Sequence, residues 1–302
     1  IDPRLAKRMP YVLNVTFPAK GKVQFDIFDP EVKRAFWDSV VEQVTPVKDD
    51  SFLLGIACPD LPVWDDKRAD YFEGLPEGSP GRLIFDHYFP DRQKELVKKR
   101  PKARNQKKEE QFLGLVADTL YRIVSGAVDH ATPDHLFFGE RFQLRSDLSD
   151  PVIAAVGKYV DVFCSQALIR SPQRPPEWQL FQPDGWAHEY KVTGRPIMII
   201  DWAAPFSLDH PYEVDTAMIK PEEEATRETN QFLIDSFEQP YIIGNFKCQL
   251  IGSHGNDRKF PPGRMKRTYL KDDGSPWPIR TEETRKAHIQ VLNTVYQDLK
   301  DR

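Results

Sequence analysis

The sequence alternates short apolar runs with longer amphipathic ones, and this alternation constrains the fold more than any other feature. When strands of a sheet run parallel, a helix usually carries the chain back between them, so strands and helices take turns. We expect strands at 11–17, 52–57, 136–142, 160–165, 197–202 and 241–249. Helices are expected near 30–44, 110–128, 151–158, 178–192, 222–238 and 282–299. The predicted fold class is α/β.

Local signals support these boundaries. Asp29 followed by Pro30 offers a helix N-cap with proline at the first helical position. Gly194 is typical of a helix end, and the strand 197–202 that follows is apolar until Asp201. A strand that is apolar on both faces fits a sheet with helices on one side and a barrel core on the other.

The last predicted helix carries apolar residues at spacings of three and four. This spacing predicts one buried stripe along the helix. Its members are Ile289, Leu292, Val295, Tyr296 and Leu299.

A closed (β/α)8 barrel has eight strands, and the sequence offers six. We therefore expect residues 1–302 to form a single TIM-barrel domain whose first two βα units are absent from this sequence. A stretch at about 58–109 is too long for an ordinary connection and is expected to be a loop insertion.

Composition excludes several classes of protein. With 40% hydrophobic and 29% charged residues the chain is expected to be globular, and its net charge of −4 gives no reason to expect a nucleic-acid partner. No apolar run approaches the length of a membrane span. Cys58, Cys164 and Cys248 form no CxxC pair; a three-thiolate metal site is conceivable, but small buried core residues are the favoured interpretation. No metal or other cofactor is expected.

Active sites of such barrels lie at the C-terminal ends of the strands, so candidates are sought there. Asp201, beside Trp202, ends a buried apolar strand, as expected for a glycosidase carboxylate beside an aromatic sugar platform. The alternative is an acid paired for structural reasons with Arg141 or Lys247. Asp60 follows an earlier strand and, taken alone, is more typical of a turn.

Other polar or aromatic residues near strand ends are candidate sugar contacts. Glu140 could bind a sugar, or it could instead form a buried ion pair with a structural role. The candidates are Asn14, Trp64, Glu140, Gln166, Trp202, Lys247 and Gln249.

Seven stretches in order carry a family resemblance: MPYVLNVTF, FDIFDPEVKRAFWDSVV, DDSFLLGIACPDLPVW, DHLFFGERF, KYVDVFCSQ, GRPIMIIDW and TNQFLIDSFEQPYIIGNFKCQ. Together they resemble the retaining glycoside hydrolases built on (β/α)8 barrels, most of all the β-agarase-like families. Those enzymes carry catalytic carboxylates on the fourth and seventh strands. The resemblance makes MPYVLNVTF the third barrel strand, in agreement with two missing leading units.

The resemblance departs at the chemistry, because both catalytic glutamates are replaced by aspartates. Asp60 falls nearest the acid/base and Asp201 takes the place of the nucleophile, while Pro59 replaces the usual Asn. The resemblance implies that Asp60 acts as general acid and Asp201 as nucleophile or general base.

The resemblance also implies a polysaccharide substrate, a red-algal-type galactan such as agarose, and a secreted or periplasmic protein. Shortening both side chains would widen the carboxyl separation by about 2–3 Å, toward that of inverting enzymes. The alternative is a barrel that has lost hydrolysis and serves as a glycan-binding or structural protein.

Overall fold

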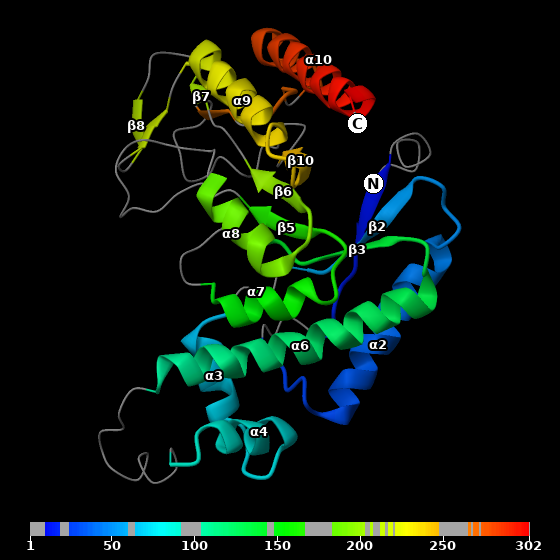
Figure 1. Cartoon of the computed structure of the whole chain (residues 1–302), viewed down its shortest axis with the longest axis vertical. Coiled ribbons are helices and arrows are strands. Elements are labelled where there is room, and N and C mark those ends of the chain that lie inside the picture. Colours follow the sequence, from blue (N-terminus) through cyan, green and yellow to red (C-terminus); the bar gives the residue numbers. More distant parts are fainter. Residues whose placement is uncertain are drawn as a thin grey trace. The chain divides into compact units, whose positions relative to one another are not determined.

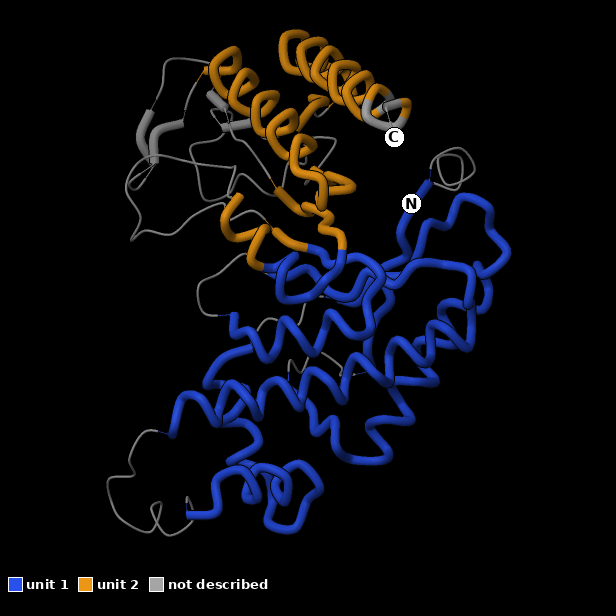
Figure 2. The backbone as a smooth tube through the Cα atoms, viewed as in Figure 1, with its two compact units in different colours: residues 1–164, 189–195 blue, residues 165–188, 196–302 orange. Residues whose placement is uncertain are grey.

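The computed structural model describes residues 10–18, 24–59, 64–91, 104–143, 148–166, 183–202, 206–207, 212–214, 217–219, 221–247, 265–266, 268–271 and 273–301. Two compact units make up the chain (Figure 2). Unit 1 comprises residues 1–164 and 189–195, and unit 2 comprises residues 165–188 and 196–302.

Unit 1 contains a three-stranded sheet in the order β1-β2-β3. Its strands are β1 (Tyr11–Asn14), β2 (Leu53–Ala57) and β3 (Leu136–Gly139), all parallel to their neighbours. Glycine is required at position 55, because a Cβ there would lie 2.1 Å from the carbonyl oxygen of Leu136. The close approach of β2 to β3 therefore depends on this residue.

Three helices pack together in unit 1. They are α2 (Pro30–Val44), α6 (Gln106–Ala131) and α7 (Asp150–Gly157), and the long α6 runs beside both of the others (Figure 1). Helix α2 begins as the sequence predicts, with the Asp29 side chain accepting from the Glu31 N–H. A short 3₁₀ turn, η1 (Thr45–Val47), follows it.

The stretch expected as a loop at 58–109 contains two helices, α3 (Asp66–Glu73) and α4 (Pro80–Tyr88). Their buried aromatic residues pack on Phe112 of α6. The ring centroid of Phe112 lies 5.2 Å from that of Phe72 and 5.4 Å from that of Phe85, in edge-to-face geometry. These two helices therefore contribute to the core of unit 1, whereas a surface loop would not.

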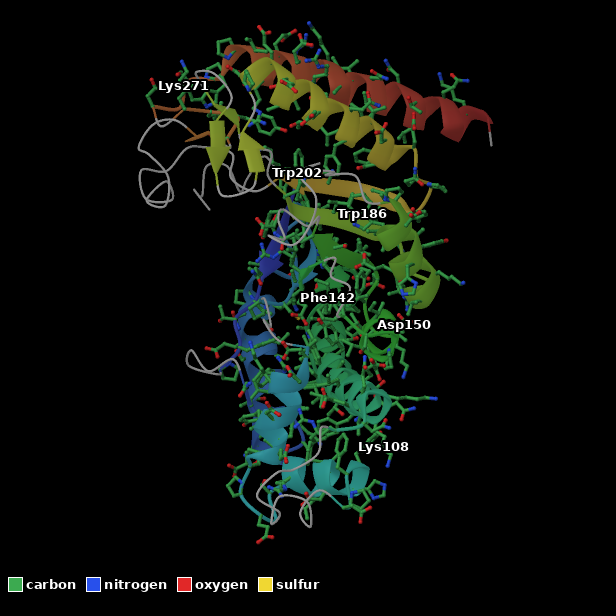
Figure 3. All side chains as sticks on the ribbon, turned by 90° about the vertical axis from the view of Figure 1, so that its left-hand side faces the viewer. Lys108, Phe142, Asp150, Trp186, Trp202 and Lys271 are labelled. Atoms are coloured by element: carbon green, nitrogen blue, oxygen red, sulfur yellow. The ribbon has the colours of Figure 1, made fainter. Side chains whose placement is uncertain are left out.

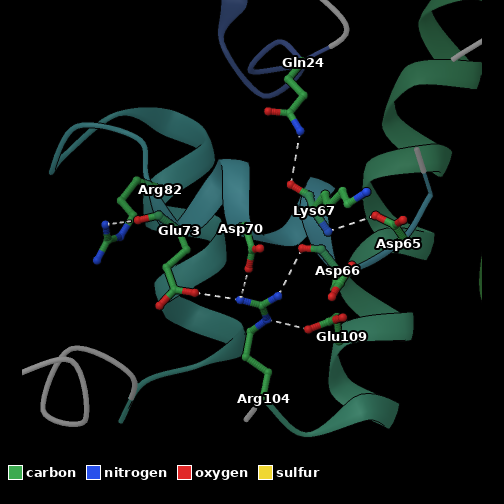
Figure 4. Close-up of polar contacts among 9 residues, drawn as sticks. All are labelled: Gln24, Asp65, Asp66, Lys67, Asp70, Glu73, Arg82, Arg104 and Glu109. Carbon is green, nitrogen blue, oxygen red and sulfur yellow. Dashed lines mark hydrogen bonds and ion pairs between the residues drawn. The ribbon is translucent and has the colours of Figure 1, made fainter. Parts of the chain in front are cut away.

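An arginine joins α3 to the start of α6 (Figure 4). The Arg104 guanidinium lies 2.6 Å from the Asp70 carboxylate and 2.7 Å from that of Glu73, and it also pairs with Glu109. A further bond, 3.1 Å long, reaches the backbone oxygen of Asp66. Burial lowers the pKa of Arg104, but the bonds to Glu109 and Asp70 outweigh burial and raise it above its ordinary value.

In unit 2, β6 (Ile197–Trp202) pairs in parallel with β10 (Ile242–Lys247) and also neighbours β5 (Phe163–Gln166), through which the chain passes from unit 1. Its helices are α9 (Glu222–Phe237) and α10 (Pro278–Asp301), which pack together. Helix α8 (Pro183–Thr193) begins in unit 2 and ends in unit 1. The remaining short strands are β4 (Phe142–Gln143), β7 (Phe206–Ser207), β8 (Tyr212–Val214), β9 (Ala217–Ile219) and β11 (Met265–Lys266).

The buried stripe predicted for the last helix is wrong. In α10 the side chains of Ile289, Leu292 and Val295 are 44%, 54% and 38% exposed. The buried positions instead are Arg280, Thr284, Ala287 and Val291. The side chains of Tyr296 and Leu299 lie outside the described residues.

The prediction of an α/β fold is confirmed, and a strand overlaps each of the six predicted ranges. Among the residues that the structure describes, the strands form no closed barrel. No described helix is long and apolar enough to cross a membrane.

Candidate active site

The predicted site residues are distributed over both units. Unit 1 contains Asn14, Trp64 and Glu140, and unit 2 contains Gln166, Asp201, Trp202 and Lys247. Asp60 and Gln249 lie outside the described residues. The structure therefore gives the position of seven of the nine predicted site residues.

Asp201 has an unusual backbone. Its φ of 52° is the one positive value among the non-glycine residues that the structure describes. Aspartate tolerates this left-handed region better than most residues, but the conformation still costs about 1–2 kcal/mol. Strain of this kind persists where the surrounding structure holds it, and it is concentrated at functional sites.

Gln166 holds Asp201 from the end of β5. Its side-chain amide donates to the Asp201 backbone oxygen at 2.9 Å and to carboxylate Oδ2 at 3.1 Å. Gln166 is 7% exposed, and its Oε1 atom is buried with no hydrogen-bond partner among the described residues. A buried acceptor without a donor is costly, so Oε1 is suited to accept from a ligand hydroxyl.

Trp202 lies beneath the end of β6 rather than on a surface. It is 1% exposed and lies at the end of β6 (Figure 3). Its ring packs edge-on against Phe232 of α9 with centroids 4.9 Å apart. Its indole N–H donates to Asn245 Oδ1 on β10. The Nζ atom of Lys247 lies 5.8 Å from the Trp202 ring centroid and 4.9 Å from that of Tyr269.

Glu140 follows β3 directly and is 2% exposed. Its Oε1 accepts from the Trp64 indole N–H and from the Tyr121 hydroxyl, each at 2.8 Å. Gly139, with φ of 66°, makes the turn into this position, where a Cβ would lie 2.8 Å from Val160 Cγ1. The carboxylate is thus enclosed by protein donors at the C-terminal end of a strand.

A buried cation lies in the same cluster. The buried Arg68 guanidinium stacks over Trp64, with its Cζ 4.4 Å from the ring centroid. Burial lowers the pKa of Arg68, and the charge of Glu140 opposes that change. Burial and the Glu140 charge both raise the pKa of Tyr121 and of Cys58 well above their ordinary values. Both groups therefore stay protonated beside the carboxylate.

Asn14 is exposed at the end of β1. With its amide oriented as the surrounding acceptors require, its nitrogen donates to the Cys58 carbonyl oxygen at 3.0 Å. Asn14 therefore supports the end of β2, the strand that precedes Asp60.

Cys58 and Cys164 are buried free thiols, which confirms the core interpretation for both. Cys248 lies outside the described residues. No group of metal-binding side chains was found within the described part of the chain.

Sequence reasoning missed several partners of the candidates. Tyr121 and Arg68 lie on α6 and α3, where helical spacing marks a buried face but not a polar role. Asn245 lies within β10, whereas the candidates predicted from the sequence lie near strand ends. A polar residue amid apolar neighbours on β10 is the signal that would have found it.

No family model matches the chain, and no curated protein matches it. Solved structures do resemble it. The structure of PfGH50B matches 94% of the chain with a TM-score of 0.71. The agarase AgWH50C matches 94% of the chain with a TM-score of 0.68, and an exo-beta-agarase matches 97% with a TM-score of 0.71. The sequence identity to this chain is 17% in each case. The chain spans 44–46% of the length of these three proteins. The likeness shows the fold, a mixed α/β chain similar to the barrels of glycoside hydrolases.

Proposed function

We propose that the chain forms the greater part of the catalytic barrel of a glycoside hydrolase that cleaves a polysaccharide. The observation that carries the proposal is Asp201, a carboxylate at the end of β6 with a left-handed backbone, held by Gln166. Functional carboxylates need a fixed orientation, and the buried Gln166 amide contributes to it by one hydrogen bond to the Asp201 carboxylate and one to its backbone oxygen.

Two carboxylates are needed for hydrolysis of a glycosidic bond. Asp201 serves as nucleophile or general base, and Asp60 serves as general acid. The general acid must hold a proton near neutral pH, which requires a raised pKa. The assignment of Asp60 rests on its place in the sequence after β2 and on the resemblance described above.

The proposed substrate class is a red-algal galactan of the agarose type, because two of the structural neighbours are named as agarases. Gln166 supports a sugar ligand, since its buried Oε1 can accept from a hydroxyl beside Asp201. Asn14, Trp64, Glu140, Trp202, Lys247 and Gln249 are proposed to bind the sugar or to hold the groups that do.

The test compares turnover of agarose and of related galactans by the full polypeptide and by Asp201→Asn and Asp60→Asn. Each substitution keeps the size of the side chain and removes its charge, so each is expected to lower kcat at least about 100-fold. Asp235→Asn is a matched control, because Asp235 accepts a hydrogen bond from Gln231 on α9. Equal, near-zero turnover in the unaltered protein and both variants would contradict hydrolysis and favour a glycan-binding barrel.

Stereochemistry gives a second measurement. Each aspartate is one methylene shorter than glutamate, and a wider carboxyl gap favours inversion. We expect proton NMR of the first sugar released to show the inverted anomer. Retention would exclude the inverting mechanism while leaving hydrolysis itself in place.

A further inference from the structure

Asp201 is the extra residue of a β-bulge in unit 2. In the parallel pairing of β6 with β10, Ile200 lies opposite Phe246 and Trp202 lies opposite Lys247. One residue of β6 is therefore inserted between two consecutive residues of β10, and it is Asp201, with its φ of 52°. A bulge bends its strand and re-aims a side chain, and bulges are over-represented next to active sites. The direction of the Asp201 carboxylate thus depends on what holds β6 on both sides of the insertion.

The peptide group that joins Asp201 to Trp202 is supported from two sides. Its oxygen accepts from the Gln166 amide at 2.9 Å. At its other end lies Trp202, which is 1% exposed and packs against Phe232 of α9. A strained backbone persists only where the surrounding structure holds it. Trp202 is therefore the second support of the left-handed residue that precedes it.

Asn245 on β10 holds the Trp202 ring. The indole N–H of Trp202 donates to Asn245 Oδ1. Asn245 lies opposite Ile199, before the bulge, whereas Trp202 follows the bulge, so this hydrogen bond spans the insertion.

The bond to Trp202 also accounts for a polar residue at this position of β10. It is the one hydrogen bond of the Asn245 side chain among the described residues, where its buried Nδ2 atom has no partner. Asparagine is disfavoured in strands, and burying half of its amide unsatisfied is costly. A buried indole N–H, in turn, needs an acceptor.

We propose that Asn245 is a positioning residue, which by fixing Trp202 holds the bulge that presents the Asp201 carboxylate. The inference rests on the proposed function, in which Asp201 is the nucleophile or general base, and deepens it. Asn245 acts through Trp202 and does not touch the sugar.

Asn245→Leu tests this route, because it keeps the size of the side chain and removes the acceptor. We expect kcat on agarose oligosaccharides to fall about 10- to 100-fold while KM changes less than about twofold. Asn245→Asp keeps an acceptor oxygen and should restore most of kcat. Asn230→Leu is the matched control, since Asn230 on α9 is likewise half-buried and accepts from the Thr284 hydroxyl at 3.1 Å. Its kcat should be unaltered, and equal losses in the two leucine variants would overturn the positioning role.

A double-mutant cycle shows whether the one hydrogen bond carries the effect. Trp202→Phe removes the donor of the bond that Asn245→Leu breaks at the acceptor. The double variant should therefore have a kcat within about twofold of the slower single variant. Losses that multiply would mean that the two residues act independently, which contradicts the proposal.

Hydrogen exchange of the Trp202 indole N–H, followed by NMR, supplies a measurement that does not depend on activity. Its resonance is identified by its absence from the spectrum of Trp202→Phe. We expect exchange about tenfold faster or more in Asn245→Leu and an unchanged rate in Asn230→Leu. Unchanged exchange in Asn245→Leu would overturn the anchoring. A rise in KM with kcat preserved would show that Asn245 contacts the sugar instead.

The two proposals fail in distinguishable ways. If the unaltered protein hydrolyses no galactan, the proposed function fails and the positioning role fails with it, while exchange still decides whether Asn245 holds Trp202. If hydrolysis depends on Asp201 but not on Asn245, the positioning role alone is refuted.

Discussion

The amide of Gln166 binds Asp201 twice, through the backbone oxygen at 2.9 Å and through the carboxylate at 3.1 Å. Gln166→Leu keeps much of the volume and removes both bonds, so the carboxylate loses one of the contacts that orient it. We expect kcat to fall about 10- to 100-fold with a small change in unfolding free energy. Steady-state kinetics with urea denaturation checks this, and an unaltered kcat would show that the bonds have no role in turnover.

The backbone of Asp201 gives a stability prediction that is independent of chemistry. At φ of 52° a Cβ is unfavourable, so Asp201→Gly should be more stable than Asp201→Ala by about 1–2 kcal/mol. Ordinary strand positions show the reverse order, because glycine weakens a strand. Chemical denaturation of the two variants decides between these outcomes.

We expect Arg104 to contribute more to the unfolding free energy than an exposed ion pair does. Its side chain is 7% exposed and meets three carboxylates, so Arg104→Ala leaves buried charge uncompensated and should lower the unfolding free energy by about 2–4 kcal/mol. Arg104→Lys should recover only part of this, since an ammonium lacks the planar fork. The exposed pair of Arg285 with Glu282 is the control, and Arg285→Ala should lower the unfolding free energy far less than Arg104→Ala does.

Because the thiol of Cys164 is buried, we expect the folded state to lose stability at alkaline pH. Burial raises the pKa of its thiol from 9.0 to about 12, so the folded state keeps a proton that the unfolded state releases. The stabilisation is complete below about pH 9 and is lost as pH rises toward 12, by at most about 1.4 kcal/mol per pH unit. In Cys164→Ala the unfolding free energy should decline less steeply between pH 9 and 11. Parallel curves for the two proteins would contradict the assignment.

The two faces of α10 should respond differently to truncation. Val291 is 7% exposed and Leu292 is 54% exposed. Val291→Ala should therefore cost about 1–3 kcal/mol, whereas Leu292→Ala should stay within about 0.5 kcal/mol. Thermal and urea unfolding of both variants measures the contrast, and equal losses would mean that Leu292 is covered in solution.

Much of the fold could be predicted from the sequence because its local signals agree with its packing. The cap at Asp29 and Pro30 and the run Ile197–Trp202 set α2 and β6 at the predicted bounds. The helices α3 and α4 escaped prediction because each is only eight or nine residues long, within a stretch rich in charge, glycine and proline.

The error in α10 has a different cause. Periodicity identifies a face by its large apolar residues, yet this helix buries a face made of Arg280, Thr284, Ala287 and Val291. These positions follow helical spacing too, but small and polar residues give no hydrophobic signal. Tertiary contact with α9, rather than the strength of the apolar pattern, decides which face is buried.

For the candidate site, the sequence correctly predicted that Asp201 lies at the end of an apolar strand, and its catalytic role remains a proposal. The residues that hold the candidates come from elements distant in sequence. Tyr121, for example, is 19 residues from Glu140, and Trp64 is 76 residues from it. Such pairings depend on packing, and spacing along one sequence does not encode them.

The passage of the chain between the two units also bears on how the polypeptide is made. Residues 189–195 belong to unit 1, although unit 2 has already begun at residue 165. During synthesis, unit 1 is therefore complete only after residues 165–188 of unit 2 have also been translated. A break in the chain between residues 165 and 195 would separate residues that belong to the same unit, so the two units are expected to be expressed together as one polypeptide.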